Sequence, residues 1–263
     1  MEVHHHAQHA SHKKGWTSYL LEFLMLFLAV FLGFLAENLR ENISDRRKEK
    51  GYIRSLAEDL KTDTASFNHI INDNKFIVAG EDTVINSFSA DLHNQDSADL
   101  AIIYFLKYGI NYFVATITDR TISQLKNNGG LRLIQNSSVS DSIMGYYNSS
   151  LALNEQANTV KNLMLANDKE ANSIININAN RPLLDSFMTS TSVDFFTPID
   201  QAKQFITHHG PALLTYDPKT LATFMADIEY QRGAMMGYVI LLRLQKEFAS
   251  ALIKLLRKEY HLN

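Results

Sequence analysis

Residues 16–40, WTSYLLEFLMLFLAVFLGFLAENLR, contain the longest apolar run in the chain. Residues 23–36 are fourteen consecutive positions without a polar side chain. A helix over residues 16–36 would be about 31 Å long, which matches the roughly 30 Å hydrocarbon core of a bilayer. The stretch therefore predicts a single transmembrane helix.

Two other interpretations of this stretch are weaker. A cleaved signal peptide needs a basic start and a small-residue cleavage site. Lys13 and Lys14 supply the start, but residues 37–40 (ENLR) offer no such site. A surface helix of a soluble protein keeps one polar face, whereas this run is apolar all round. We therefore expect an uncleaved anchor at residues 16–40, preceded by a tail at 1–15 and followed by one domain at 41–263.

Small residues and one acid stand out inside the anchor. Ala29, Gly33 and Ala36 form a stripe that would let two helix backbones approach closely in lipid. Glu22 lies one turn inside the expected boundary, where an ionisable group usually faces a partner or water. These four residues predict helix association in the membrane; the alternative for Glu22 is that its carboxylate reaches the interface.

The composition excludes several classes of protein. The formal net charge is −3, so no basic footprint for nucleic acid is present. The chain has no cysteine, which excludes disulfides and thiol chemistry. Only four prolines and eleven glycines occur, a scarcity that favours long helices.

The tail begins MEVHHHAQHASHKK and holds five of the ten histidines. His5, His9 and His12 would share one face if the tail were helical. Imidazoles at that spacing can bind Zn, Cu or Ni, and the alternative is a solvated, disordered tail. We expect no other cofactor.

After the anchor, apolar residues recur at alternating spacings of three and four, the signature of a long helix packed along one stripe. The stripe contains Ile53, Leu56, Leu60, Phe67, Ile70, Ile77, Val84 and Phe88, with Asp63, Asn74 and Glu81 at the skipped positions. The helix either continues from the anchor or begins anew near Asn42 or Ser44. Its carboxylates are interpreted as solvated surface charge, namely Glu58, Asp59, Asp63 and Asp73.

A second stripe is the most regular in the chain and predicts a long packed helix. Its members are Val139, Ile143, Tyr146, Ser150, Leu153, Ala157, Val160, Met164, Asn167, Ala171 and Ile174. Ser150 and Asn167 are polar members that can fix register. The preceding INYFVATIT (110–118) is β-branched and aromatic; without a second strand pattern, it indicates buried helix or extended core.

Residues 176–217 form an irregular segment with three of the four prolines. Asp217 as N-cap and Pro218 at the first helical position then start a last helix. Its apolar stripe contains Leu221, Met225, Ile228, Met235, Val239, Leu242, Ala249, Ile253, Leu256 and Tyr260. Gly233 and Gly237 predict close packing against another helix, or a bend. We expect no second membrane span.

These patterns predict an all-α fold: one N-terminal transmembrane helix followed by a coiled-coil-like bundle of long helices. Orientation is ambiguous. Five basic residues follow the anchor within fifteen residues and only two precede it, which favours a cytoplasmic domain. A short basic tail before an uncleaved anchor favours the opposite, and we expect the domain outside.

The stretches MEVHHH, EFLMLFLAVFLGFLAENLREN and EKGYIRSLAEDLKTD, with TISQLKNNGGLRLI and IMGYYN later, resemble a family of uncharacterised single-pass membrane proteins of Bacteroidota. The resemblance covers the anchor and about half of the remaining chain. It implies a bacterial inner-membrane location and a native histidine tail. The outward orientation expected above would make the domain periplasmic. It supplies no active site.

No nucleotide-binding, hydrolase or zinc-protease motif occurs, and we expect no enzymatic activity. Three functions remain. The first is a structural or interaction protein that oligomerises or serves as an accessory subunit of a membrane complex. The second is a ligand-sensing bundle with a pocket lined by Tyr104, Tyr108, Tyr112 and Tyr146. The third is metal handling by the histidine tail.

Overall fold

The computed structural model describes residues 15–127, 129–189, 198–206 and 210–262. These residues are helical and contain no β-strand, only an isolated antiparallel bridge between Ile175 and Leu213. The predicted all-α class is therefore confirmed. The chain forms two compact units, Met1–Gly51 and Tyr52–Asn263. We call the second unit the helical domain.

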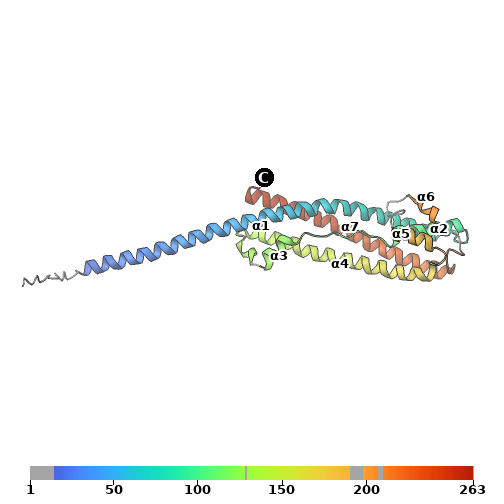
Figure 1. Ribbon diagram of the computed structural model, residues 1–263, viewed down its shortest axis with the longest axis horizontal. Helices are drawn as coiled ribbons and strands as arrows, with labels where there is room; N and C mark the ends of the chain where they lie inside the picture. The colour runs from blue at the N-terminus through green and yellow to red at the C-terminus, as the bar shows by residue number, and fades with distance from the viewer. Residues whose placement is uncertain (1–14, 128, 190–197, 207–209, 263) are drawn as a thin grey trace, which may run out of the picture. The chain divides into compact units, whose positions relative to one another are not determined.

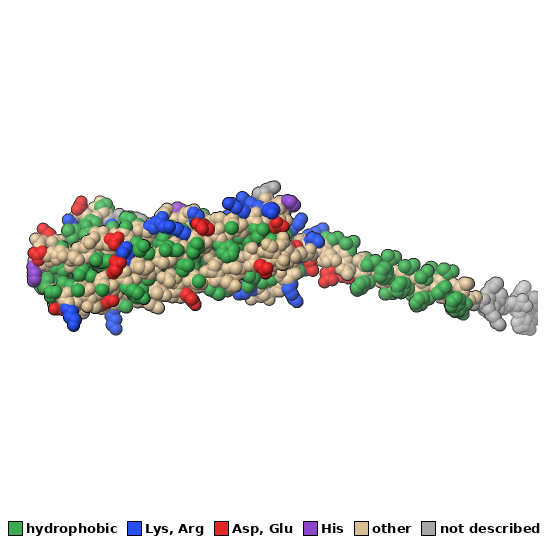
Figure 2. Space-filling model, turned by 180° about the vertical axis from the view of Figure 1, so that it is seen from behind, with side chains coloured by type: hydrophobic (Ala, Val, Ile, Leu, Met, Phe, Trp, Pro, Cys, Tyr) green, Lys and Arg blue, Asp and Glu red, His purple; other side chains and the backbone are tan. Residues whose placement is uncertain are grey.

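Helix α1 (Trp16–Phe88) continues from the anchor stretch without a break, which decides between the two starts that the sequence left open. Its N-terminal part contains a window of mean hydropathy 2.3, and none of that window is buried. Hydrophobic side chains cover this stretch on the face shown in Figure 2. It is the one helix in the described residues that is long and apolar enough to cross a membrane.

In the helical domain, the remainder of α1 lies alongside α4 (Ser137–Ile174) and α7 (Pro218–Tyr260) (Figure 1). Two clusters of buried side chains join these helices. The smaller cluster includes Leu56 of α1, Ile143 of α4 and Leu252 of α7. The larger one includes Phe67, Leu153 and Phe224 and extends to the shorter helices. The apolar stripes seen in the sequence thus supply most of the core.

Side-chain caps start the two later long helices, and the Asp217 cap of the last one is as predicted. The Asn136 side chain accepts a hydrogen bond from Val139 N at the start of α4. The Asp217 carboxylate accepts one from Thr220 N at 2.8 Å, with Pro218 at the first helical position of α7. The stripe predicted for α4 is confirmed: each member is buried except Met164, which is half-buried. In α7 the prediction missed Phe224 and Tyr238, two of the largest buried side chains.

Short elements connect the long helices. They are α2 (Gln95–Tyr104), the π-helical turn η1 (Phe105–Gly109), α3 (Arg120–Asn127), η2 (Gly130–Leu133), α5 (Arg181–Thr189), α6 (Ile199–Ala202) and η3 (Lys203–Phe205). Residues 111–119 have no regular secondary structure and run along the domain from the end of η1 to α3 (Figure 1). We call them the extended segment; of the two interpretations that the sequence allowed, the extended core is correct.

Glycines mark where backbones meet closely and where they do not. A Cβ on Gly80 would lie 2.2 Å from the ring of Tyr108, so the ring packs directly on the backbone of α1. A Cβ on Gly233 would have no neighbouring atom within 4 Å. A Cβ on Gly237 would lie 3.4 Å from Nε2 of Gln156, an ordinary van der Waals distance. The close packing predicted for Gly233 is therefore wrong, and at Gly237 the contact with α4 is an ordinary one.

Gly80→Ala is expected to destabilise the helical domain by about 1–3 kcal/mol, because overpacking outweighs the gain in helix propensity. The matched change Gly233→Ala, in an exposed helical position, should stabilise it by roughly 0.5–1 kcal/mol. Urea denaturation of the full chain in mild detergent measures both. Equal effects of the two changes would contradict the packing of Tyr108 on Gly80.

Candidate functional site

Four polar side chains of α1 face the core, and two of them, Asp63 and Asn74, bind the extended segment. Asp59, Asp63, Asn74 and Glu81 are each at most 4% exposed. A segment without β-partners has backbone N–H and C=O groups that need hydrogen-bond partners once they are buried. In this domain, side chains of α1 and α7 supply them.

Asn74 binds both backbone groups of Phe113. Its Nδ2 donates to Phe113 O at 2.8 Å, and its Oδ1 accepts from Phe113 N at 2.9 Å. Two residues further on, Ala115 N donates to the Tyr238 hydroxyl of α7 at 2.9 Å. Asn74 and Tyr238 therefore take the place of a neighbouring strand along one edge of the segment.

Asp63 holds the end of the segment. Its Oδ1 accepts from Thr118 N at 2.9 Å and from Thr118 Oγ1 at 2.7 Å, and its Oδ2 accepts from the Tyr146 hydroxyl of α4 at 2.9 Å. Burial and the adjacent Asp63 carboxylate raise the pKa of Tyr146, so its phenol stays protonated and donates. One carboxylate thus joins α1, the segment and α4.

Asp59 fixes the start of α3. It accepts from Thr121 N at 3.3 Å, from the Thr121 hydroxyl and from Arg120 at 2.6 Å. A carboxylate at a helix N-terminus bonds free N–H groups and complements the helix dipole. The prediction that Asp59 and Asp63 are surface charge is therefore wrong, because both are buried against residues 118–121 and Asp63 also against Tyr146. Glu58 is exposed as predicted, and Asp73 is half-buried.

Glu81 is the most unusual group of the site. Gln231 Nε2 donates to Glu81 Oε1 at 2.7 Å and to Gly109 O at 2.9 Å, while Gln231 Oε1 accepts from Asn167 Nδ2 at 2.9 Å. Glu81 Oε2 is buried without a hydrogen-bond partner. Burial raises the pKa of Glu81 to about 8. The fold therefore holds this carboxyl in its protonated form near neutral pH.

The two polar members of the α4 stripe have different roles. Asn167 bonds across to α7, through Gln231 and the carbonyl of Asp227. Ser150 donates to the carbonyl of Tyr147 in its own helix. The structure therefore supports a registering role for Asn167 and shows no such contact for Ser150.

The four tyrosines predicted to line one pocket are not brought together. Tyr104 and Tyr108 stack with ring centroids 6.4 Å apart, and Tyr112 packs against the same larger cluster. Tyr146 belongs to the smaller cluster, where it bonds Asp63. The prediction that Tyr146 lines the same pocket as the other three tyrosines is therefore wrong.

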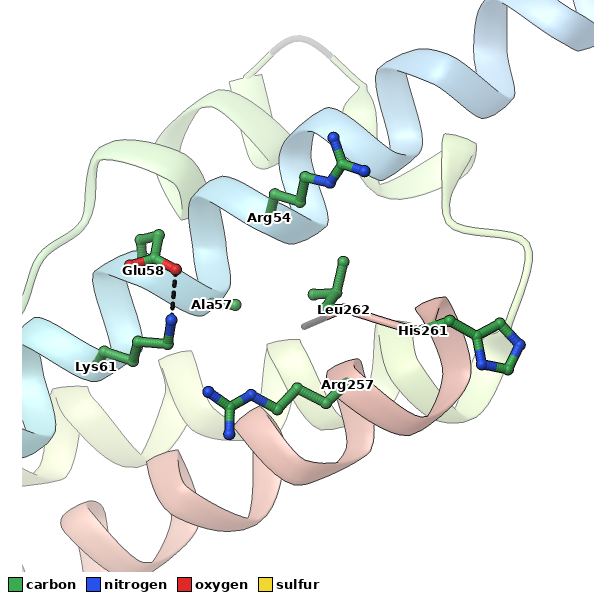
Figure 3. A pocket seen from close by; sticks show the side chains of 7 residues that line it. All are labelled: Arg54, Ala57, Glu58, Lys61, Arg257, His261 and Leu262. Atoms are coloured by element: carbon green, nitrogen blue, oxygen red, sulfur yellow. Dashed lines mark hydrogen bonds and ion pairs between the residues drawn. The ribbon is translucent and has the colours of Figure 1, made fainter.

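A basic pocket of about 410 Å³ lies between α1 and the end of α7 (Figure 3). It is lined by Arg54, Ala57, Glu58, Lys61, Arg257, His261 and Leu262. In Figure 3, the Arg257 side chain extends from α7 toward the side of α1 on which Lys61 bonds Glu58. The basic side chains are exposed or half-exposed, and Arg257 lies in the last turn, where a cation stabilises the helix dipole. Helix stabilisation accounts for the position of Arg257.

The remaining predicted site residues are three histidines of the tail and four residues of the anchor. His5, His9 and His12 lie outside the described residues, so their metal binding stays a prediction. Within the described ranges, no group of three or more His, Cys, Asp or Glu side chains could hold a metal ion. Ala29, Gly33 and Ala36 are exposed on α1 and Glu22 is half-exposed, and nothing tests their association.

Comparison with known proteins identifies no relative. No protein-family model, no curated protein and no solved structure matches the chain. Function is therefore argued from the described residues.

Proposed function

We propose that the protein is a single-pass, membrane-anchored interaction protein whose helical domain is a coiled-coil-like bundle of long helices. It acts as an oligomer or as an accessory subunit of a complex in a bacterial inner membrane, with the domain on the periplasmic side. The observation that carries the proposal is the uncovered apolar part of α1. An 18-residue window of mean hydropathy 2.3 buries nothing against the described chain, and hydrocarbon is the medium that covers such a surface.

The helical domain supports the second half of the proposal. The domain has its own buried core. Side-chain hydrogen bonds hold the backbone of the extended segment in place. Together these contacts make the domain rigid. A rigid body on an anchor is suited to present a surface to other proteins. We therefore place the function in binding and assembly.

Replacing both Leu28 and Leu32 with arginine is expected to release the protein from membranes. A central arginine costs about 2.5–3.5 kcal/mol on insertion scales, so two cost roughly 5–7 kcal/mol. Flotation of carbonate-washed membranes on a density gradient measures the outcome. The matched control places arginine at Ile240 and Leu244, two exposed apolar residues of α7. This variant should still float with the membranes. Flotation of the Leu28/Leu32 variant would contradict the anchor.

The assembly half is tested on the native protein. Extraction in mild detergent followed by native mass measurement should give an oligomer or a stoichiometric partner; a monomer alone would contradict it. Orientation is read from Glu247→Cys, because the chain has no cysteine of its own. An impermeant maleimide should label this exposed position in spheroplasts if the domain is periplasmic.

A further inference from the structure

The extended segment has two backbone edges, and its central residues 113–116 are bonded along only one of them. On the other edge, the Thr118 N–H at the end of the segment donates to Asp63. In an extended chain, successive residues direct their N–H and C=O groups to opposite edges. Phe113 and Ala115 direct theirs to Asn74 and Tyr238. Val114 and Thr116 therefore present theirs to the opposite edge. Both residues are exposed, and neither backbone makes a hydrogen bond within the described part of the chain.

The burial of the side chains supports this extended geometry. Ala115 is buried, its neighbours Val114 and Thr116 are exposed, and Phe113 and Ile117 pack against the core. Such alternation is the period of a β-strand. The segment is thus an extended chain in an otherwise helical domain, with unbonded backbone groups at Val114 and Thr116.

A groove of about 300 Å³, which we call the strand groove, lies between the segment and α4. It is lined by Ala115, Thr116, Ile117, Asp119, Ile122, Tyr147, Ser150, Leu151 and Asn154. Leu151 is 48% exposed, and the Asn154 amide makes no hydrogen bond within the described residues. Asp119 is the one charged side chain in the lining. The groove therefore offers apolar contact, an amide and one negative charge.

We propose that the strand groove binds an extended peptide segment of a partner protein, which adds as a second strand to Val114 and Thr116. This inference rests on the interaction function proposed above and assigns its site. The free groups alternate along the chain, so the complementary surface is another extended backbone. A helix cannot supply it, because its backbone groups bond within the helix.

The lining also sets the side chains of the partner. Every second residue of an added strand faces the groove, so apolar side chains would pack on Tyr147 and Leu151. Asp119 favours a basic residue at the end of the peptide nearest α3. The expected partner is thus an extended, apolar segment with a lysine or arginine.

The test uses the full chain in lipid nanodiscs and a displayed library of random heptapeptides. Enriched peptides are synthesised with a fluorophore, and their affinity is measured by anisotropy. Thr116→Pro removes the free N–H and tolerates the extended backbone, whereas Thr116→Val keeps it. We expect the dissociation constant to rise at least tenfold for Thr116→Pro and less than twofold for Thr116→Val. Peptides that are N-methylated at the residues pairing with the segment should also bind with at least tenfold lower affinity.

Leu151→Arg is a second variant that leaves the segment intact, and it should weaken binding by at least tenfold because it repels the basic residue. Absence of enriched peptides, or equal affinity for wild type, Thr116→Pro and Leu151→Arg, would overturn the proposal. Membrane flotation and native mass are read on the same variants. A protein that stays anchored and assembled but selects no peptide loses this proposal alone.

Discussion

Glu81→Gln is expected to stabilise the helical domain strongly at pH 9 and to change its stability little at pH 5. The pKa of Glu81 is about 8 in the fold against an ordinary 4.5, because burial disfavours the charged form. The folded state therefore binds more protons than the unfolded state between these values. This contribution is fully present below pH 4.5 and is lost as the pH rises through 8. At ~1.36 kcal/mol per pKa unit, the contribution of Glu81 to the free energy of unfolding falls by about 5 kcal/mol over this range.

Glutamine has the shape of the protonated glutamate and cannot ionise. Its Oε1 can accept the hydrogen bond from Gln231, so the neutral network is preserved. The other charged groups near Glu81 are Asp82 of α1 and Glu229 and Arg232 of α7, where Arg232 lies 3.2 Å from Asp82 and 2.7 Å from Glu229. These groups pair among themselves in both proteins, so they do not generate the difference between pH 5 and pH 9.

Urea denaturation at pH 5, 7 and 9, followed by near-UV circular dichroism, measures the effect. The matched control is Glu247→Gln, an exposed glutamate of α7, which should shift the free energy of unfolding by less than about 0.5 kcal/mol at each pH. An equal gain for Glu81→Gln at pH 5 and pH 9 would show that Glu81 does not fold in its protonated form.

Asp63→Ala is expected to lower the free energy of unfolding by about 3–5 kcal/mol. The change removes three hydrogen bonds and leaves the N–H and hydroxyl of Thr118 and the hydroxyl of Tyr146 without their acceptor. Bonds to a charged group contribute about 1.5–3 kcal/mol each, and buried donors without a partner add a desolvation cost. Asp63→Asn keeps one acceptor oxygen, so it should lose less.

The same urea denaturation at pH 7 measures this loss. Asp73→Ala, in the same helix, should cost less than about 0.5 kcal/mol, because this half-buried carboxylate makes no hydrogen bond within the described residues. A double-mutant cycle with Tyr146→Phe should show coupling of roughly 0.5–3 kcal/mol. Equal losses for Asp63→Ala and Asp73→Ala would contradict the bridging role of Asp63.

Elements governed by local pattern could be predicted from the sequence. The α4 stripe was identified to within one half-buried residue, Met164, because a helix repeats its buried face at fixed spacing. The Asp217 cap followed from the adjacent pair Asp217 and Pro218. Asn74 and Glu81 were placed in the α1 stripe by spacing alone, and both are buried. Asp63 has the same spacing and is also buried, but it was interpreted as surface charge.

The candidate site could not be predicted in the same way. The donors to Asp59 lie 61 and 62 residues further along the chain, and Tyr238 lies 123 residues from Ala115. No local pattern marks these pairs, so Asp59 was interpreted by its usual preference for solvent. The one available signal was the polar residues in an apolar stripe, which indicate buried partners without naming them.

The extended segment affects how the domain reaches its structure. Helical proteins usually fold through contacts between near neighbours in the sequence, which need little loop-closure entropy. Here the bonds to Asn74, Asp63 and Tyr238 close loops of 39, 55 and 123 residues. The bonds to Asn74 and Asp63 need α1 alone, whereas the bond to Tyr238 also needs α7. We expect these long-range bonds to form late on the folding path. Their loss would accelerate unfolding more than it slows folding.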